Sequence, residues 1–255
     1  MKVVILCGGR GTRMNEITDD LPKPLVNVGG KPILWHIMKI YAHYGFKEFV
    51  LCLGYKGEKI KEYFMDYHSW RNTDFTVKLG KENELKHHKE DTEDWTITFA
   101  NTGVNTNTGG RIKKIEKYIT EDQFFCTYGD GVSDVNIAEL LKFHNKMGKI
   151  ATLTAVRPIS QFGILKLQNN LVTEFKEKPL LKDYINGGFF VFKKEIFNYL
   201  KENDVLEKNP FETLSKKKQL AAYKVEGFWQ CMDTFKDYQA LNDVWHSNQA
   251  KWKVW

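Results

Sequence analysis

A glycine-rich segment near the start of the chain has the composition of a phosphate-binding loop. Residues 8–13 read Gly-Gly-Arg-Gly-Thr-Arg and follow an apolar run at residues 3–6 that predicts a buried strand. Glycines after a first strand let backbone N–H groups approach phosphate oxygens. Two arginines in the loop favour a polyphosphate over a neutral ligand. Taken alone, a glycine turn with a purely structural role explains the segment about equally well.

Two other phosphate-binding loops do not fit this segment. The dinucleotide fingerprint needs a third glycine where Met14 stands, and the P-loop ends in Gly-Lys followed by Ser or Thr. The missing glycine argues against a dinucleotide-dependent oxidoreductase, which is the alternative from a different enzyme class.

A lysine fixed between two prolines follows the loop. Pro22 and Pro24 hold the backbone extended on either side of Lys23. Such a lysine is suited to a fixed contact with a phosphate. Considered by itself, a rigid surface loop with a solvated lysine is the more common explanation.

The loop and the Pro-Lys-Pro segment together resemble the signature of the sugar-1-phosphate nucleotidyltransferases. Further segments match in the order that this family requires: Tyr-Gly-Asp at 128–130, Glu-Lys-Pro at 177–179, Asn-Gly-Gly-Phe-Phe at 186–190 and Trp-Gln-Cys-Met-Asp-Thr at 229–234. Residues 31–39, 108–111 and 251–255 are similar to the branch of the family that uses CTP and glucose 1-phosphate. The similarity runs through nearly the whole chain. Cys231 departs from it, since proline is expected there, but this affects no catalytic residue.

The resemblance implies transfer of a cytidylyl group from CTP to α-D-glucose 1-phosphate, giving CDP-glucose and pyrophosphate. The product would supply deoxysugars of surface polysaccharide such as lipopolysaccharide O-antigen. The second pKa of a phosphate monoester is about 6, so the attacking oxygen is already ionised and needs no general base. Catalysis is then positioning and charge neutralisation. The alternatives are the same reaction with UTP, dTTP, GTP or another sugar 1-phosphate, and an inactive sugar-nucleotide sensor. Intact Lys23, Asp130 and Asp233 argue against the sensor.

The resemblance also implies roles for individual residues. Lys23, Arg13 and Asp130 are expected to be catalytic, and Asp130 and Asp233 to hold one Mg²⁺, which prefers carboxylate and phosphate oxygens. For each aspartate the alternative role is a helix N-cap. The expected nucleotide-binding residues are Leu6, Gly8, Gly9, Arg10, Gly11, Thr12, Arg13, Lys23, Thr108, Arg111 and Gly129. The expected sugar-phosphate-binding residues are Glu177, Lys178, Asn186 and Gly187, while Trp229 could pack on the sugar ring or equally in the core.

Alternating strand and helix patterns must position these residues. Apolar runs at 3–6, 49–53, 124–126 and 151–156 predict strands, and helical periodicity appears at 32–44, 58–64 and 137–147. This alternation predicts an α/β fold with a mainly parallel (mixed) central sheet flanked by helices. The family resemblance makes it a Rossmann-like nucleotidyltransferase fold. In such sheets the ligand lies beyond the carboxyl ends of the strands.

The second half of the chain is less regular and predicts a small antiparallel extension. Strands are expected at 163–167, 172–176 and 189–192, and helices at 211–218 and 235–246. We expect one domain over 1–255, with residues 1–135 mainly binding nucleotide and residues 136–255 mainly binding sugar phosphate. The charged segment 81–94 contains His87 and His88, which could bind a metal, but adjacent residues cannot share one face. We therefore expect an exposed loop or insertion there.

Composition limits the remaining classes. The chain has 255 residues, 42% of them hydrophobic, and a formal charge of +6, but no arginine-rich stretch interleaved with aromatics that would indicate a nucleic-acid surface. A modest positive charge suits small polyanionic substrates. No apolar run approaches the roughly 18 residues of a membrane span, and no signal peptide is evident, so we expect a cytoplasmic protein without a membrane partner. Cys7, Cys52 and Cys126 are expected to be buried thiols. The resemblance implies a homo-oligomer, with a hexamer as one form.

Overall fold

The structure is a computed structural model that describes residues 1–11, 20–66, 75–80, 84–87, 93–160 and 162–255. The predicted site residues Thr12 and Arg13 lie outside the described residues. The strands are β1 Val3–Cys7, β2 Asn27–Val28, β3 Lys31–Pro32, β4 Glu48–Leu53, β5 Phe75–Lys78, β6 Glu84–His87, β7 Thr96–Asn101, β8 Gln123–Tyr128, β9 Gly131–Ser133, β10 Ala151–Val156, β11 Ile164–Gln168, β12 Leu171–Lys176, β13 Ile185–Lys193, β14 Leu220–Val225 and β15 Trp229–Cys231.

The helices are α2 Ile33–His43, α3 Gly57–Met65, α4 Thr108–Lys114, α5 Ile137–Met147, α6 Asn209–Lys216 and α7 Phe235–His246. Short 3-10 helices cover Lys23–Leu25, Glu116–Tyr118 and Lys194–Tyr199. None of the helices in the described ranges has both the length and the apolar character needed to cross a membrane.

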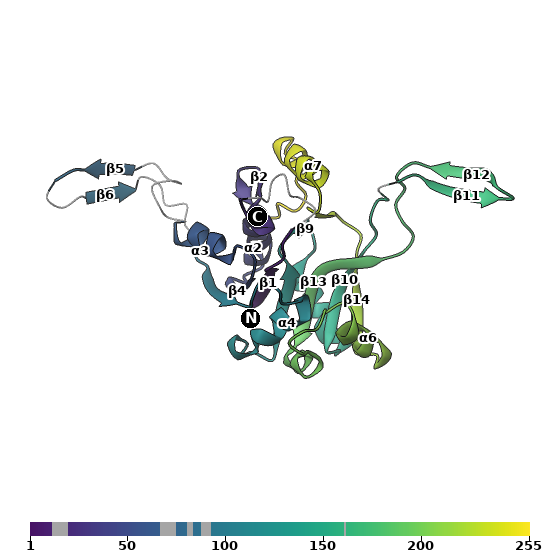
Figure 1. The fold of residues 1–255 in the computed structure, drawn as a ribbon, viewed down its shortest axis with the longest axis horizontal. Coiled ribbons are helices and arrows are strands. Elements are labelled where there is room, and N and C mark those ends of the chain that lie inside the picture. The colour runs from purple at the N-terminus through teal and green to yellow at the C-terminus, as the bar shows by residue number, and fades with distance from the viewer. Residues whose placement is uncertain (12–19, 67–74, 81–83, 88–92, 161) are drawn as a thin grey trace.

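A seven-stranded sheet, in the order β14-β10-β13-β8-β1-β4-β7, runs through the middle of the described structure (Figure 1). Strands β8, β1, β4 and β7 are parallel to one another, and β10 is parallel to β14. Strand β13 is antiparallel to both of its neighbours, β8 and β10. The mainly parallel, mixed sheet flanked by helices is therefore confirmed.

The central strand β1 is buried on both faces because its side chains alternate between two cores. Val3, Ile5 and Cys7 belong to the core that also contains side chains of α2, α5 and α7. Val4 and Leu6 belong to the opposite core, with side chains of α4 and α6. A strand covered on both faces reads as a continuous apolar run, which is why the sequence signal for β1 is strong.

The topology gathers several chain segments at one edge of the sheet. The carboxyl ends of β1 and β8 lie side by side, because these strands are parallel and Leu6 pairs with Tyr128. Since β13 is antiparallel to β8, its amino end, starting at Ile185, lies at the same edge. The glycine-rich loop, the segment at 128–130 and the segment at 185–187 therefore converge, as expected for a ligand site in this fold class.

Two antiparallel ribbons project from the body at opposite ends of its long axis (Figure 1). One is β11 paired with β12, which is the predicted antiparallel extension. The other is β5 paired with β6, so residues 84–87 of the segment expected to be an exposed loop or insertion form one strand of a projecting ribbon (Figure 1).

Candidate active site

A cavity of about 690 Å³ opens at this edge of the sheet. Its walls are formed by Leu6–Gly9, Gly11, Lys23, Pro24, Thr106–Thr108, Arg111, Tyr128–Asp130, Ile185, Asn186, Trp229, Cys231 and Asp233. Segments from both halves of the chain meet here. The cavity brings together most of the residues that the sequence predicted for a nucleotide and sugar-phosphate site.

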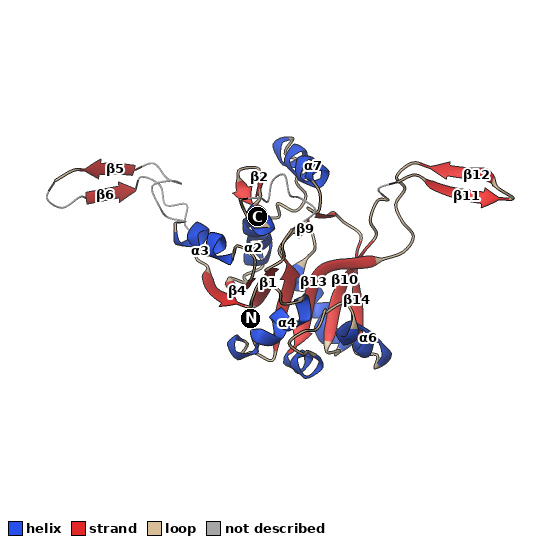
Figure 2. Cartoon of the chain, in the orientation of Figure 1, coloured by secondary structure: helices blue, strands red, loops and turns tan. Residues whose placement is uncertain are grey.

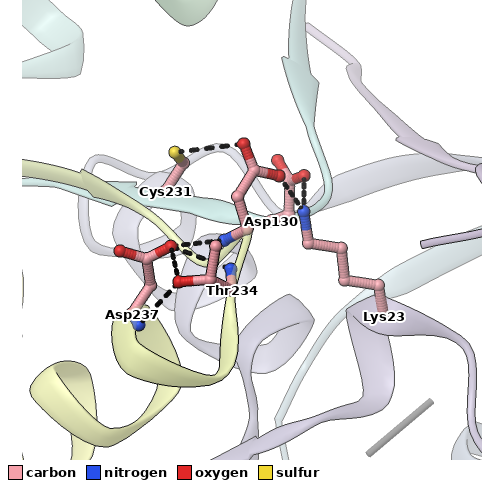
Figure 3. Close-up of polar contacts among 6 residues, drawn as sticks. Lys23, Asp130, Cys231, Thr234 and Asp237 are labelled. Atoms are coloured by element: carbon pink, nitrogen blue, oxygen red, sulfur yellow. Dashed lines mark hydrogen bonds and ion pairs between the residues drawn. The ribbon is translucent and has the colours of Figure 1, made fainter. Parts of the chain in front are cut away.

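Lys23 joins two carboxylates on the cavity wall. Its Nζ lies 2.7 Å from Asp130 Oδ2 and 2.5 Å from Asp233 Oδ1. Figure 3 shows the lysine side chain extended toward Asp130. The two aspartates are separated by more than a hundred positions in the sequence, yet a single cation contacts both.

A small antiparallel ladder explains why the two aspartates meet. Strand β9 pairs with β15, with Gly131 opposite Cys231, and the Met232 N–H donates to the Asp130 carbonyl at 2.8 Å. Asp130 precedes β9 and Asp233 follows β15, so this pairing holds both at the same end of the ladder. Pro22 and Pro24 fix Lys23 at the start of the short 3-10 helix that faces the two aspartates.

The helix-cap alternative for these aspartates is wrong. The N-cap of α7 is Thr234, and Asp237 completes a capping box with it. The Asp237 carboxylate also accepts a hydrogen bond from the backbone N–H of Asp233, at 3.1 Å. Asp130 is followed by strand β9, and the next helix, α5, is capped by Asn136. Both carboxylates are therefore available to the cavity.

The electrostatics of the cavity favour a charged lysine. Burial on its own would lower the pKa of Lys23, but Asp130 and Asp233 outweigh burial and raise that pKa above its ordinary value. The neighbouring Cys231 is different, since burial and then Asp233 raise the pKa of its thiol to about 12. The thiol is therefore protonated at neutral pH and is not poised as a nucleophile.

The glycine-rich loop rests on a buried arginine. Arg111 is 4% exposed, and its Nη2 donates to the Gly8 carbonyl at 2.9 Å. Its Nη1 donates to the carbonyls of Leu53 and Gly103 and to Thr102 Oγ1. A Cβ added to Gly8 would lie 2.0 Å from Arg111 Nη1, so only glycine allows this approach. Arg111 thus supports the loop from behind and also lines the cavity, and its predicted contact with the nucleotide stays a prediction.

The other residues of the glycine-rich loop differ in their position relative to the cavity. Gly9 and Gly11 line the cavity, and Gly11 has a φ of 63°, a conformation that glycine adopts readily. Arg10 is exposed, and its guanidinium donates to Asn105 Oδ1 at 3.0 Å. Direct phosphate contacts from Thr12 and Arg13 remain predictions, because these two residues lie outside the described ranges.

A polar network lines the opposite wall of the cavity. Asn186 Nδ2 donates to the Tyr128 hydroxyl at 3.1 Å, and the same hydroxyl donates to Glu207. Trp229 Nε1 donates to the Gly187 carbonyl at 2.7 Å, which holds the indole on the cavity wall. Gly187 itself is a backbone support for Trp229. The sequence left Trp229 open between core and sugar contact, and its side chain both packs against the core and lines the cavity, so sugar contact stays a prediction.

Glu177 and Lys178 do not line the cavity. They lie between the β11–β12 ribbon and β13, both exposed, with a carboxylate-to-ammonium distance of 3.7 Å. Lys178 has a φ of 44°, in the left-handed region that is uncommon for residues with side chains. Their predicted contact with the sugar phosphate stays a prediction.

Sequence reasoning did not identify several residues that shape the site. Glu207 accepts hydrogen bonds from both Tyr128 and Thr108, the second at 2.8 Å. Glu207 lies in a turn before α6, far in sequence from any matching segment. No local pattern could have indicated its position, because the contact is made only when the sheet is assembled.

The site fits a small divalent cation through its carboxylates. Asp130 and Asp233 each place an oxygen on the same ammonium nitrogen, so one cation at that point is within reach of both. In the described ranges no group of three or more His, Cys, Asp or Glu side chains could enclose a metal ion. Two carboxylates with open positions left for phosphate and water are typical of Mg²⁺ sites.

Comparison with known proteins identifies the family. Residues 2–247 match the nucleotidyl transferase family. The chain belongs to this family. It is 47% identical to the probable glucose-1-phosphate cytidylyltransferase of Bacillus subtilis, over the full length of both chains. It is 45% identical to the glucose-1-phosphate cytidylyltransferase of Salmonella typhi, again over both full lengths.

Solved structures of other nucleotidyltransferases share the fold. HddC from Yersinia pseudotuberculosis has a TM-score of 0.70 and 22% identity, with coverage of 96% of this chain and 99% of that one. UDP-glucose pyrophosphorylase in complex with UDP-glucose has a TM-score of 0.69 and 15% identity, covering 97% and 98% of the two chains. At these identities the likeness supports the fold alone.

Proposed function

We propose that this nucleotidyltransferase transfers the cytidylyl group of CTP to α-D-glucose 1-phosphate and releases pyrophosphate. The observation that carries the transfer chemistry is Lys23, held between Asp130 and Asp233 beside the glycine-rich loop. The choice of CTP and glucose 1-phosphate is supported by the names of the relatives that are 44–47% identical over their full length.

The cavity has two sides that suit the two substrates. We assign the nucleotide to the side formed by the glycine-rich loop and the Thr106–Thr108 segment, and the sugar phosphate to the side formed by Asn186 and Trp229. This follows the proposed division at residues 1–135 and 136–255, because the first wall comes from the first part of the chain and the second wall from the second. Lys23 also lines the cavity, and we assign the α-phosphate to its ammonium group.

The proposed reaction needs charge neutralisation more than proton transfer. The attacking phosphate oxygen carries its own negative charge at neutral pH. It must approach a triphosphate that is also negative, and an ammonium group fixed by two prolines opposes this repulsion without reorganising. Oriented N–H groups of the Gly8–Gly11 segment would hold the triphosphate in line with the attacking oxygen. No described residue has to act as a general base.

We assign Mg²⁺ to Asp130 and Asp233. When bound, it would neutralise phosphate charge and hold the pyrophosphate in a fixed orientation. Both aspartates lie within reach of Lys23 Nζ, so the lysine must turn toward the phosphates when the carboxylates take another cation.

A substrate panel tests the proposed activity. The purified protein with Mg²⁺ is given each of CTP, UTP, dTTP and GTP with glucose 1-phosphate, mannose 1-phosphate or galactose 1-phosphate, and pyrophosphate release is measured. We expect the highest kcat/KM for CTP with glucose 1-phosphate. Higher values with another nucleotide would overturn the cytidylyl assignment and leave the transferase class intact. The absence of pyrophosphate release in every combination would contradict the activity itself.

We further propose that the β11–β12 ribbon mediates a homo-oligomer, for which a hexamer is one form. Figure 2 shows this ribbon extending away from the body with no described helix against it. Leu167, Leu171 and Phe175 are 64%, 72% and 61% exposed. A two-stranded ribbon is marginally stable alone in water, and exposed apolar groups of this kind mark association surfaces. A second copy would cover them.

A further inference from the structure

A second cavity, of about 570 Å³, opens at the edge of the sheet opposite the active site. Strand β13 runs from Ile185 at the active-site edge to Lys193 at the other edge, where the Lys193 N–H donates to the Ile150 carbonyl. Ile150 lines the second cavity, and the other walls come from the 3-10 helix Lys194–Tyr199, the turn after it and α6. Among the described residues, none lines both cavities.

Two lysine side chains bring positive charge to this second cavity. Lys201 lines it from the turn after the 3-10 helix, and Lys217 lines it from the end of α6. Within the described ranges neither ammonium group forms an ion pair with a carboxylate. Unpaired ammonium groups on the wall of a concave site attract anions and bind phosphate oxygens as point charges.

An aromatic ring positions one of these charges. The Lys217 ammonium nitrogen lies 4.9 Å from the centre of the Tyr199 ring, which is half-buried and lines the cavity as well. A contact of this kind is favourable and leaves the charge of the lysine unneutralised. The ammonium group is therefore held at the cavity before any ligand arrives.

The remaining polar groups of the second cavity suit the hydroxyls of a sugar. Glu195 only accepts hydrogen bonds, whereas the amides of Asn198 and Asn209 can both donate and accept. Asn209 Oδ1 accepts a long bond from Thr213 at 3.4 Å, and the side chains of Glu195 and Asn198 make no hydrogen bond to other described residues. A carboxylate opposes a ligand that is anionic throughout, but it accepts readily from a hydroxyl.

We propose that the second cavity binds a phosphorylated sugar. The phosphate contacts Lys201 and Lys217, and sugar hydroxyls contact Glu195, Asn198 and Asn209. The cavity lies in the size range of about 300–1,000 Å³ that is usual for small-molecule sites. Glucose 1-phosphate and CDP-glucose both carry the required groups, and the site does not depend on the reaction proposed above.

Protection of lysines from acetylation tests where the ligand binds. The protein is pulsed with acetic anhydride in the presence of glucose 1-phosphate, CDP-glucose, inorganic phosphate or glucose, and each lysine is followed by mass spectrometry. A ligand at about ten times its Kd leaves roughly a tenth of the sites free, so acetylation of Lys201 and Lys217 should slow roughly tenfold. Lys194 and Lys216 are exposed on the same two helices outside the cavity, and they should react as before.

A double variant tests the two charges. Lys201→Gln with Lys217→Gln keeps most of each side-chain stem and removes the charge, and equilibrium dialysis measures binding of radiolabelled glucose 1-phosphate and CDP-glucose. The unaltered protein should bind one molecule in this cavity besides any in the active site. In the double variant its affinity should fall at least tenfold, because two charged hydrogen-bond donors are lost. Lys194→Gln with Lys216→Gln removes the same charge and should leave binding unchanged.

The outcomes decide between the proposal and its alternatives. Stronger protection by glucose 1-phosphate or by CDP-glucose identifies which of the two the cavity prefers. If neither protects Lys201 and Lys217, or if inorganic phosphate protects them equally well, the proposal is overturned. Unchanged dialysis in the double variant would overturn the placement of the phosphate. Melting temperature and pyrophosphate release of this variant should match the unaltered protein, and if it proves unstable, protection in the unaltered protein decides.

Discussion

At the scale of single residues, Lys23 is the group whose charge the site is built to hold. Two prolines fix its backbone, and two carboxylates fix its ammonium group. In this arrangement the lysine occupies the position that a divalent cation would take between Asp130 and Asp233. On the proposed function, Lys23 would have two tasks, one at the phosphates during transfer and one at the carboxylates before the substrates arrive.

Replacing Lys23 with methionine should affect these two tasks in opposite directions. The kcat should fall by about 10²–10³, because one preorganised charge at the reacting phosphate is lost. In the absence of nucleotide, Mn²⁺ should bind roughly tenfold more tightly, equivalent to about 1.4 kcal/mol, since the carboxylates lose their internal cation. Steady-state kinetics and electron paramagnetic resonance titration measure the two effects.

The control for this change is Lys59→Met, which breaks an exposed lysine–glutamate pair on α3. It should leave kcat and Mn²⁺ affinity as they are. Equal Mn²⁺ affinity in Lys23→Met and the unaltered protein would show that the lysine does not compete for the carboxylates.

Asp233→Asn should abolish Mg²⁺-dependent activity while the protein stays folded. The substitution keeps the size of the side chain and removes its charge, and the cap of α7 belongs to Thr234. The rate at saturating substrates and the melting temperature are measured together. Asp237→Asn provides the contrast, because it breaks the capping box and should cost about 1 kcal/mol of stability. A folded Asp233→Asn protein with a near-normal rate at low Mg²⁺ would contradict the ligand role.

The sequence predicted the grouping of Lys23, Asp130 and Asp233 better than the rest of the cavity. Each lies in a short segment with recognisable neighbours, so a family resemblance could place all three. Glu207 and the supporting role of Arg111 could not be predicted in this way. Arg111 reaches the Gly8 carbonyl and Glu207 reaches the Tyr128 hydroxyl, both more than fifty positions away, and such contacts leave no pattern in the local sequence.

At the scale of elements, Arg111 ties together the carboxyl ends of neighbouring strands. Its bonds reach Gly8 after β1, Leu53 at the end of β4, and residues 102–104 after β7. Burial lowers the pKa of Arg111, although it remains charged. The cost of burying this charge is offset by hydrogen bonds to several carbonyl oxygens instead of by an ion pair with a carboxylate.

Arg111→Lys should destabilise the protein by about 3 kcal/mol, because one ammonium cannot replace bonds that diverge to three strand ends. The glycine-rich loop should loosen, and KM for the nucleotide should rise more than KM for the sugar phosphate. Urea unfolding and kinetics with each substrate varied in turn measure these effects. Arg157→Lys is the matched control, since its ion pair with Glu226 is exposed. A selective rise in KM for the sugar phosphate would contradict the assignment of the loop.

Most strands and helices around the centre of the seven-stranded sheet were predictable, and the two edge strands of this sheet were not. The predicted bounds 137–147, 151–156 and 235–246 agree with α5, β10 and α7. Strands β7 and β14 were missed. They are the two edge strands of the sheet, where half of the side chains face water and the apolar signal fades. Their place is set by pairing with β4 and β10, which no local pattern records.

At the scale of the whole molecule, a buried histidine joins the two ends of the chain. His36 of α2 is fully buried, and its Nε2 lies 2.8 Å from the Val28 carbonyl. Trp252 Nε1 lies 3.4 Å from its Nδ1. The His36 ring therefore donates from Nε2 and accepts at Nδ1, which is the hydrogen-bond pattern of a neutral imidazole. Burial lowers the pKa of His36 to about 4.

Stability should therefore fall as the pH drops from about 6.5 to about 4. The unfolded chain takes up a proton near the ordinary histidine pKa of about 6.5, whereas the folded chain resists protonation until about pH 4. This difference is worth about 3 kcal/mol once the pH is below both values. Urea unfolding at pH 7.5, 6, 5 and 4.5 measures it. His36→Gln should reduce the slope but not abolish it, because burial also lowers the pKa of His144 to about 4. His246→Gln, at an exposed position, should leave the slope unchanged. An unchanged slope in His36→Gln would assign the pH dependence to other groups.

The projecting ribbon should decide the state of association. Leu171→Glu with Phe175→Glu places charge on its exposed apolar residues, so the proposed oligomer should dissociate while the sheet remains folded. Light scattering after size-exclusion chromatography measures the mass, and Lys166→Glu, on the same ribbon, separates loss of apolar contact from added charge. A monomeric unaltered protein, or an unchanged mass in the double variant, would contradict the proposal.

The single antiparallel strand of the sheet also affects how the chain is made. Strand β10 pairs only with β13 and β14 in the sheet, so it has no place to join when it leaves the ribosome. The edge of β8 remains open until residue 185 begins β13. The segment from the end of β8 at Tyr128 to residue 185 is synthesised at about 5–20 residues per second, so the edge stays open for roughly 3–11 s. During synthesis, the nascent chain therefore carries an unpaired, apolar strand edge that a chaperone or a second nascent chain can reach before β13 closes it.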